Sequence, residues 1–308
     1  MIEIRRLTKK YGSKTAVNDV TFNIPDNETL GFLGRNGAGK STTLNIITGY
    51  TPSSSGSVLI DGIDIVSYPE AAKRLIGYLP EQPPLYPEMT VEEYLYFAAA
   101  LKGVKKARRK EQIERAMEDV TATDVRNKLI SGLSRGYRQR VGIAQAILNE
   151  PKYIILDEPT SGLDPVQIME VRELIKKLAV NRAVVISSHI LSEMSGVCSR
   201  LVILHNGVIA AMGAVEELVR PSEGYGELIA RSASPTAEGI IRSVQGVADV
   251  TLLAPVEPGM YDFLIKCNLD CRQEIIGECF RSGGRLVLLQ PRQVSLESVF
   301  MRAINEEG

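Results

Sequence analysis

The sequence predicts an α/β domain with a mainly parallel sheet over residues 1–220, followed by a small α+β domain over residues 226–308. Short apolar runs such as TLGFLG, KYIILDE and AVVISSH alternate with helix-like segments, and such runs are typical of strands buried on both faces. Each run ends in polar residues. Since ligands of open α/β sheets bind beyond the carboxyl ends of strands, we expect these polar ends to converge. The stretch RPSEGYG, residues 220–226, marks the expected linker.

Length and composition limit the class of protein. The 308 residues suffice for one large domain with a sizeable core and a small second one. Lys and Arg number 36 and Asp and Glu 37, so a formal net charge of -1 supplies no global basic field for nucleic acid. No stretch approaches the roughly 20 apolar residues that span a bilayer, and MIEIRRLTKKYG lacks the apolar run of a signal peptide. We expect a chain that neither crosses a membrane nor is secreted by this route, although it could dock on a membrane protein.

The cysteine spacing fits no zinc pattern, and neither histidine is near the last three cysteines. Buried reduced thiols are the favoured interpretation, and a metal cluster of cysteine and acidic ligands is the alternative. The cysteines are Cys198, Cys267, Cys271 and Cys279.

A helical insertion over about 86–133 interrupts the α/β pattern. TVEEYLYFAAALKG and RRKEQIERAMEDV are helix-like, and Thr90 with Glu93 three residues later predicts a capping box at the first helix. In the small domain the pattern runs strand, helix, hairpin, helix, strand, which predicts the split βαβ, ferredoxin-like arrangement. SLESVFMRAI is expected to close the chain as an amphipathic helix, with Ser295 as a candidate cap.

GRNGAGKST fits the phosphate-loop pattern G-x-x-x-x-G-K-[ST] between a strand and a helix. Small residues let backbone N–H groups and the helix N-terminus meet a phosphate. We expect Lys40 to reach the β- and γ-phosphates, Ser41 to bind Mg²⁺ and Thr42 to help hold the α-phosphate of a nucleotide. A merely structural turn is disfavoured because the motif and its context agree. The loop comprises Gly34, Arg35, Asn36, Gly37, Ala38, Gly39, Lys40, Ser41 and Thr42.

Two carboxylates follow the buried run IIL. Asp157 is placed to hold Mg²⁺, directly or through water, and Glu158 points differently and is placed to polarise an attacking water. An adjacent Asp-Glu pair is common on surfaces and is weak evidence alone. The phosphate loop upstream makes the pair a strong indication of nucleotide chemistry.

Together these motifs resemble the nucleotide-binding subunit of an ABC (ATP-binding cassette) transporter, over Ile2 to about Val219. The resemblance implies a P-loop NTPase cassette whose parallel sheet carries an antiparallel edge and a helical subdomain. It implies that Tyr11 stacks on adenine, that Gln82 touches Mg²⁺ and senses the permease, and that His189 senses the γ-phosphate. The loop SGLD, residues 161–164, would communicate across a dimer.

The segment LSRGYRQR, residues 133–140, resembles the family signature LSGGQ but departs from it at two of five positions. Ser134 and Gly136 remain, and in the family these positions contact the γ-phosphate of ATP on the opposite subunit. Ser134 is also a candidate N-cap. If the turn needed a positive φ at Arg135, strain of about 1–3 kcal/mol would follow. We interpret the segment as a working variant; a signature too weak to close the dimer is the alternative.

The resemblance thus predicts an ATPase that dimerises around two ATP molecules and drives a separate membrane permease from the cytoplasmic face of the membrane. LSRG, the small domain and SLESVF resemble the ABC-2-type exporter branch, which favours export. A soluble ABC-type ATPase acting on nucleic acid or ribosomes is the alternative, supported only by the basic run KGVKKARRK. A P-loop kinase would leave the signature, SGLD and His189 without roles. The small domain is expected to support the dimer, to regulate the ATPase or to contact the permease. The alternative is an appendage that only stabilises the fold.

Overall fold

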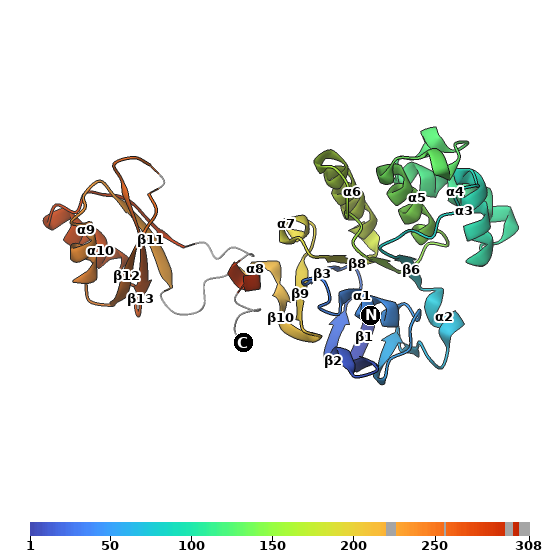
Figure 1. The fold of residues 1–308 in the computed structure, drawn as a ribbon, viewed down its shortest axis with the longest axis horizontal. Coiled ribbons are helices and arrows are strands. Elements are labelled where there is room, and N and C mark those ends of the chain that lie inside the picture. Colours follow the sequence, from blue (N-terminus) through green and yellow to red (C-terminus); the bar gives the residue numbers. More distant parts are fainter. Residues whose placement is uncertain (220–225, 256, 293–297, 302–308) are drawn as a thin grey trace. The chain divides into compact units, whose positions relative to one another are not determined.

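The computed structural model describes residues 1–219, 226–255, 257–292 and 298–301 (Figure 1). The chain divides into two compact units, one formed by Met1–Val215 together with the chain end from Phe300, the other by Glu216–Val299. This division differs from the expected ranges 1–220 and 226–308, because the break falls before Glu216 and the chain end groups with the first unit. The expected linker lies, apart from Gly226, outside the described residues, as does the candidate cap Ser295.

The first unit is built on a six-stranded sheet with the order β10-β9-β3-β8-β7-β6. The pairs joining β9, β3, β8, β7 and β6 are parallel, and only β10 is antiparallel to its neighbour. The α/β class and its antiparallel edge are therefore confirmed. The strands are β3 (Thr29–Leu33), β6 (Ile76–Leu79), β7 (Tyr153–Leu156), β8 (Ala183–Ser188), β9 (Arg200–His205) and β10 (Val208–Ala214).

The register of this sheet brings the polar strand ends together. Leu33 at the end of β3 pairs with Ser188 of β8, and Leu156 at the end of β7 pairs with Ile186 of the same strand. The phosphate loop, the carboxylate pair and His189 therefore follow three adjacent strands at one edge of the sheet. Residues of β3, β7 and β8 are buried throughout, which explains their continuous apolar sequence.

An antiparallel sheet of order β2-β1-β4-β5 packs with the main sheet around a shared core. The rings of Phe22 on β2 and Phe32 on β3 have centroids 5.5 Å apart, and Leu44 of α1 joins the same core cluster. These elements are β1 (Ile2–Tyr11), β2 (Lys14–Ile24), β4 (Ser55–Ile60), β5 (Ile63–Asp64) and α1 (Lys40–Ile47).

The helical insertion consists of α3 (Val91–Leu101) and α4 (Lys106–Asp119), followed by α5 (Arg135–Ile147), and Figure 1 shows these helices gathered beside β6. The predicted capping box is present, since Thr90 Oγ1 accepts from the Glu93 N–H and the Glu93 carboxylate accepts from the Thr90 N–H. The remaining helices are α2 (Pro69–Lys73), α6 (Pro165–Leu178), α7 (Leu191–Met194) and α8 (Val215–Leu218), with short 3₁₀ turns at Thr123–Val125, Ile130–Gly132 and Ala179–Asn181.

The second unit has the element order strand, helix, strand, strand, helix, strand. Its sheet is antiparallel throughout, in the order β12-β13-β11-β14, with the two helices contributing to one apolar core. Cys271 and Cys279 are buried in that core, and the described cysteines are free thiols. The elements are β11 (Glu227–Ser232), α9 (Ala237–Arg242), β12 (Val247–Leu253), β13 (Tyr261–Cys267), α10 (Arg272–Arg281) and β14 (Leu286–Pro291). Across the described parts of both units, we find no helix with the length and apolar character needed to cross a membrane.

Candidate active site

The phosphate-loop sequence forms the turn between β3 and α1, and two of its glycines take conformations that favour glycine. Gly39 has φ +105°, and a Cβ atom there would lie 2.6 Å from the carbonyl oxygen of Ala16. Gly37 has φ +82°. No described side chain caps the start of α1, so its first N–H groups stay available to an anion. Gly49 ends α1 at φ +67°, as its position in the sequence predicts.

Asp157 leaves β7 in a buried position beside the phosphate loop. Its side chain is only 2% exposed, and Oδ1 accepts a hydrogen bond of 2.5 Å from the Ser187 hydroxyl. Burial raises the pKa of Asp157, and hydrogen bonds from the Ser187 and Ser41 hydroxyls oppose that rise. Ser41 and Asp157, which were predicted to share a magnesium ion, therefore lie near enough for the Ser41 hydroxyl to lower the pKa of Asp157.

Glu158 connects the two other predicted catalytic residues. Its Oε1 lies 3.3 Å from Lys40 Nζ, and its Oε2 lies 2.9 Å from His189 Nδ1. A carboxylate only accepts, so Nδ1 of a neutral His189 carries the shared proton. The Glu158 backbone is left-handed, at φ +49°, which turns its side chain away from that of Asp157. The three side chains form one cluster that is drawn from three strand ends.

Lys40 has a second set of contacts that fixes its ammonium group. Its Nζ donates to the carbonyl oxygen of Gly34 at 2.7 Å and to that of Arg35 at 3.4 Å. The side chain is 5% exposed and therefore held inside the loop rather than extended into solvent. The loop thus folds around its own lysine, with one carboxylate oxygen nearby.

Ser187 is a site residue that sequence reasoning misses. Its hydroxyl donates to Asp157 and accepts from the backbone N–H of Glu158 at 2.8 Å, so it fixes both carboxylate-bearing residues. The only signal in the sequence is a polar residue at the end of the buried run AVVISSH. Its role depends on the parallel register of β7 and β8, which the sequence does not specify.

A cavity of about 500 Å³ opens over the phosphate loop. Tyr11, at the end of β1, lines it with a half-exposed ring, and the Lys9 ammonium lies over that ring, 5.0 Å from its centroid. Among the described residues no group of three His, Cys, Asp or Glu side chains is placed to hold a metal by itself. A hydroxyl and one buried carboxylate suit Mg²⁺ that also binds phosphate oxygens. The cavity is lined by Tyr11, Lys14, Ala16, Asn36, Gly37, Gly39, Lys40, Ser41, Thr42, Glu81, Glu158, Ser161 and His189.

Gln82 is not brought into this cavity. It lies in the exposed loop after β6, whereas its neighbour Glu81 is one of the lining residues. The signature residues Ser134 and Gly136 also stand apart from the cavity that surrounds the phosphate loop. The structure therefore assembles the phosphate loop, Asp157, Glu158, His189 and Tyr11, and leaves these three predicted residues outside.

The departures from the signature are accommodated within the chain. Ser134 caps α5 by accepting from the Tyr137 N–H at 3.4 Å, as predicted. Arg135 is the first residue of α5 and does not have a positive φ, so the condition under which it would be strained is not met. Its guanidinium covers Gly162 so closely that a Cβ atom added there would clash with it. The Tyr137 hydroxyl donates to Asp124 at 2.6 Å, which gives the second departure a partner.

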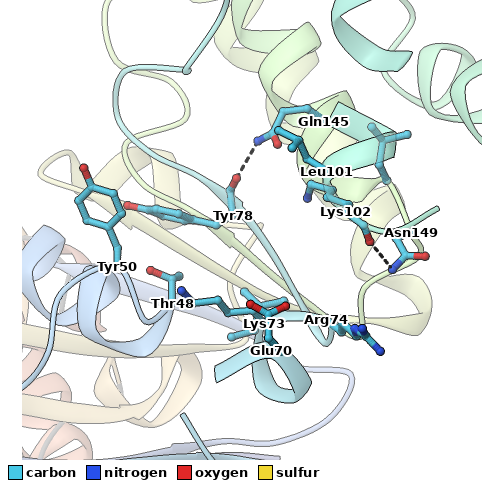
Figure 2. A pocket seen from close by; sticks show the side chains of 13 residues that line it. Thr48, Tyr50, Glu70, Lys73, Arg74, Tyr78, Leu101, Lys102, Gln145 and Asn149 are labelled. Carbon is cyan, nitrogen blue, oxygen red and sulfur yellow. Dashed lines mark hydrogen bonds between the residues drawn. The ribbon is translucent and has the colours of Figure 1, made fainter. Parts of the chain in front are cut away.

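A second cavity, of about 460 Å³, lies between α2, β6 and the C-terminal ends of α3 and α5 (Figure 2). Gln145 of α5 donates to the carbonyl oxygen of Tyr78 on β6 at 2.7 Å. Lys102 donates through Nζ to the carbonyl oxygen of Ala146 at 3.2 Å, and burial lowers its pKa to about 8. No described carboxylate lies within ion-pair distance of its ammonium. This cavity is thus separate from the phosphate loop but is joined to α5.

Comparison with known proteins identifies the family. Residues 17–161 match the model of the ABC transporter family. The uncharacterised ABC transporter ATP-binding protein YxlF of Bacillus subtilis is 33% identical over 99% of this chain and 100% of its own length. The bacitracin transport ATP-binding protein BcrA of Enterococcus faecalis is 32% identical over 100% of this chain and 97% of its own. A dimeric post-hydrolysis structure of the ATP-binding cassette MJ0796 with ADP and Pi superposes with a TM-score of 0.63, at 27% identity over 70% of this chain and 99% of that one. The chain therefore belongs to the ATP-binding subunits of ABC transporters, a family of ATPases.

Proposed function

We propose that this chain is the ATP-hydrolysing motor subunit of an exporter, dimerises around two ATP molecules and drives a separate membrane permease. The observation that carries the proposal is the cluster of Lys40, Glu158 and His189, which lie on the segments that follow three adjacent strands. It supplies a cation for phosphate, a carboxylate for water and an imidazole fixed to that carboxylate.

Each residue of the cluster has a defined role in hydrolysis. Lys40 and the N–H groups of the loop bind the β- and γ-phosphates and stabilise charge on the transferring group. Glu158 accepts a hydrogen bond from the attacking water and thereby polarises that water. His189, oriented by Glu158, binds the γ-phosphate. Ser41 and Asp157 would hold Mg²⁺, joined by Gln82 if its loop moved toward the phosphates, and the ion would supply positive charge that neutralises the phosphates.

The proposed dimer is supported by the position of the signature residues, which lie outside the phosphate cavity of their own chain. Ser134 sits at the start of α5, whose helix N-terminus attracts negative charge, yet it does not line its own chain's phosphate cavity. In the proposed dimer, each ATP lies between one chain's phosphate loop and the other chain's Ser134 and Gly136. The second subunit is proposed to be an identical copy.

The proposed contact with the permease is the second cavity and the helical insertion around it. Helix α5 runs from Ser134, at the proposed ATP interface, to the region of Gln145 and Ala146 that borders this cavity (Figure 2). Because Gln145 hydrogen-bonds to β6, movement of α5 would also move the strand that leads into the Gln82 loop. This arrangement supports coupling between dimer closure and a partner at the cytoplasmic face of the membrane. Export is supported by relatives named for bacitracin transport and linearmycin resistance.

The rival role on nucleic acid depends on the basic run of residues 102–110, and the structure gives several of these charges other partners. Lys102 faces the second cavity, Arg108 lies 3.6 Å from Glu150, and Arg109 donates to the Val104 carbonyl oxygen at 2.9 Å. Stimulation of the ATPase by RNA or DNA would favour this rival, whereas co-purification with an integral membrane protein would favour the permease.

The decisive experiment is the solution mass of Glu158→Gln, measured by light scattering with and without Mg-ATP. Slow hydrolysis in this variant should hold the ATP-bound dimer, so the mass should double when Mg-ATP is added. Adding Ser134→Arg, which places a bulky cation at the proposed interface, should return the mass to that of the monomer. A mass that stays monomeric while ATP is bound would contradict the homodimer.

A further inference from the structure

Glu193 links two loops of the active site through one oxygen atom. Its Oε2 accepts hydrogen bonds of 2.6 Å from both the Thr160 hydroxyl and the Ser188 hydroxyl. Thr160 is 5% exposed and Ser188 fully buried, so neither hydroxyl has ready access to water as a substitute. Two hydroxyl donors that converge on one ionised oxygen form short, strong hydrogen bonds.

The two hydroxyls belong to segments that flank the proposed catalytic residues. Thr160 follows Glu158 by two residues, and the loop between them is closed by a hydrogen bond from the Ser161 N–H to the Glu158 carbonyl oxygen at 3.1 Å. Ser188 directly precedes His189. Its hydroxyl also accepts from the Ile190 N–H at 2.9 Å, so the backbone on both sides of His189 is held.

Glu193 is itself fixed from outside the site. It lies on α7, a single helical turn whose residues Leu191 and Met194 are buried. Arg172 of α6 donates to the carbonyl oxygen of Ser195, immediately after that turn. The helical turn that carries Glu193 is therefore anchored by packing against the rest of the unit, independently of the two hydroxyls that its carboxylate holds.

We propose that Glu193 is a positioning residue that sets the distance between Glu158 and His189, an inference that rests on the proposed hydrolytic role of those two. The contact between His189 Nδ1 and Glu158 Oε2, at 2.9 Å, joins the same two segments that Glu193 joins through Thr160 and Ser188. With the carboxylate of Glu193 in place, His189 is aligned before nucleotide arrives. Without it, the segment that carries His189 is free to shift, and displacements of about 1 Å at such sites cost up to about 100-fold in rate.

The kinetic test compares Glu193→Ala with Glu193→Gln. Loss of the oxygen in Glu193→Ala should lower kcat for ATP hydrolysis by about 10–100-fold, as expected for loss of a group that orients catalytic residues. The KM for ATP should change by no more than about threefold, because the phosphate loop is untouched. Glu193→Gln keeps one oxygen that accepts both hydroxyls and should retain kcat within about threefold. Ser192→Ala, at an exposed neighbour on the same helix, is the matched control.

An NMR measurement without nucleotide tests directly whether Glu193 positions His189, independently of any effect on kcat. The chain has two histidines, so His205→Asn leaves His189 as the only imidazole for NMR. In that background the Hε1–Cε1 resonance of His189 should move or broaden in Glu193→Ala and stay in place in Glu193→Gln and Ser192→Ala. Thermal unfolding of each variant checks that the fold persists. A resonance that is unchanged in folded Glu193→Ala would overturn the proposal.

A double-mutant cycle tests the link itself. If Glu193 acts through Ser188, then the kcat loss in Glu193→Ala with Ser188→Ala should be smaller than the product of the two single losses, although it can exceed that of Glu193→Ala because Ser188 also accepts from the Ile190 N–H. Losses that multiply, or a kcat of Glu193→Ala equal to that of the unmodified chain, would refute the role. Absence of ATP hydrolysis in the unmodified chain would instead refute the proposed function, and the NMR comparison would still decide whether Glu193 positions His189.

Discussion

The phosphate-loop cavity and the second cavity described above each contain a lysine, but the charge of that lysine has different partners in the two places. Lys40 at the phosphate loop has a Glu158 oxygen 3.3 Å from its ammonium. Lys102 in the second cavity donates to a backbone carbonyl oxygen, and burial lowers its pKa to about 8. The first cavity is formed by segments that follow strands of the main sheet together with residues of β1 and β2, whereas the second is formed where helix ends meet β6 (Figure 2).

This difference indicates which of the two cavities has the ammonium of that lysine paired with a carboxylate within one chain. At the phosphate loop, the cation, the carboxylate and the imidazole already contact one another, so a substrate meets aligned groups. In the second cavity an ammonium is held partly desolvated without an ion-paired carboxylate among the described residues, which is unfavourable unless a partner supplies one. We therefore expect the first cavity to govern turnover and the second to tune stability.

The largest effect should come from Glu158→Gln. The amide keeps the shape of the side chain but cannot polarise water as a carboxylate does, so turnover should fall by about 10²–10⁴-fold while ATP binding persists. Phosphate release and equilibrium ATP binding measure the two quantities. Glu81→Gln, at the other carboxylate that lines the cavity, is the control and should stay within a few-fold of the unmodified chain. Near-normal hydrolysis by Glu158→Gln would refute its assigned role.

The second cavity is tested by Lys102→Met. Below pH 8 both folded and unfolded chains carry the ammonium, and a pKa lowered from 10.5 to about 8 costs the folded state about 3 kcal/mol. Loss of the bond to the Ala146 carbonyl oxygen subtracts about 1 kcal/mol from the gain. The free energy of unfolding of Lys102→Met at pH 7, measured in urea, should thus exceed that of the unmodified chain by about 2 kcal/mol.

The sign of the pH dependence distinguishes this effect from simple packing. Between pH 8 and 10.5 the folded chain releases the Lys102 proton before the unfolded chain does, so the stability of the unmodified chain rises with pH. The advantage of Lys102→Met should therefore shrink over that window. Lys73→Met, at an exposed lysine lining the same cavity, is the control for replacing a charged side chain at the surface of this cavity. An advantage that is constant with pH would disprove the charged-state explanation.

A smaller effect is expected at Ser134, which belongs to neither cavity of its own chain. Ser134→Ala removes the cap of α5 and should cost about 1 kcal/mol of stability in urea unfolding. It should also weaken ATP-dependent dimerisation of the Glu158→Gln background. Thr90→Ala, which removes the cap of α3, is the matched control: it should cost similar stability and leave dimerisation unchanged. Equal ATP-dependent dimerisation in the two variants would mean that Ser134 does not contribute to the dimer interface.

Local motifs explain what the sequence could predict. The phosphate loop, the Thr90–Glu93 capping box and the Ser134 cap involve residues a few positions apart, so their spacing determines their contacts. Convergence of the strand ends was predictable because it follows from a parallel sheet. The order of elements in the second unit could be read from alternating patterns of the same local kind.

Long-range contacts explain what the sequence could not predict. Ser187 meets the Asp157 carboxylate only through the register of β7 and β8, and Glu193 reaches Thr160 only because α7 folds back on the loop after β7. Lys102 looks like part of a solvated basic run until the ends of α3 and α5 withdraw it from water.

The smallest effect should come from Arg135→Gly, which restores the family residue at the altered signature position. Because Arg135 already has helical geometry, glycine there relieves no strain and costs at most about 1 kcal/mol through its flexibility. The guanidinium that covers Gly162 would be lost, which exposes the loop before α6 but leaves Ser134 and Gly136 in place. ATP-dependent dimerisation of the Glu158→Gln background, measured by light scattering, should therefore change by less than about threefold. A gain of tenfold or more would mean that Arg135 weakens closure, and the signature would then be an impaired one.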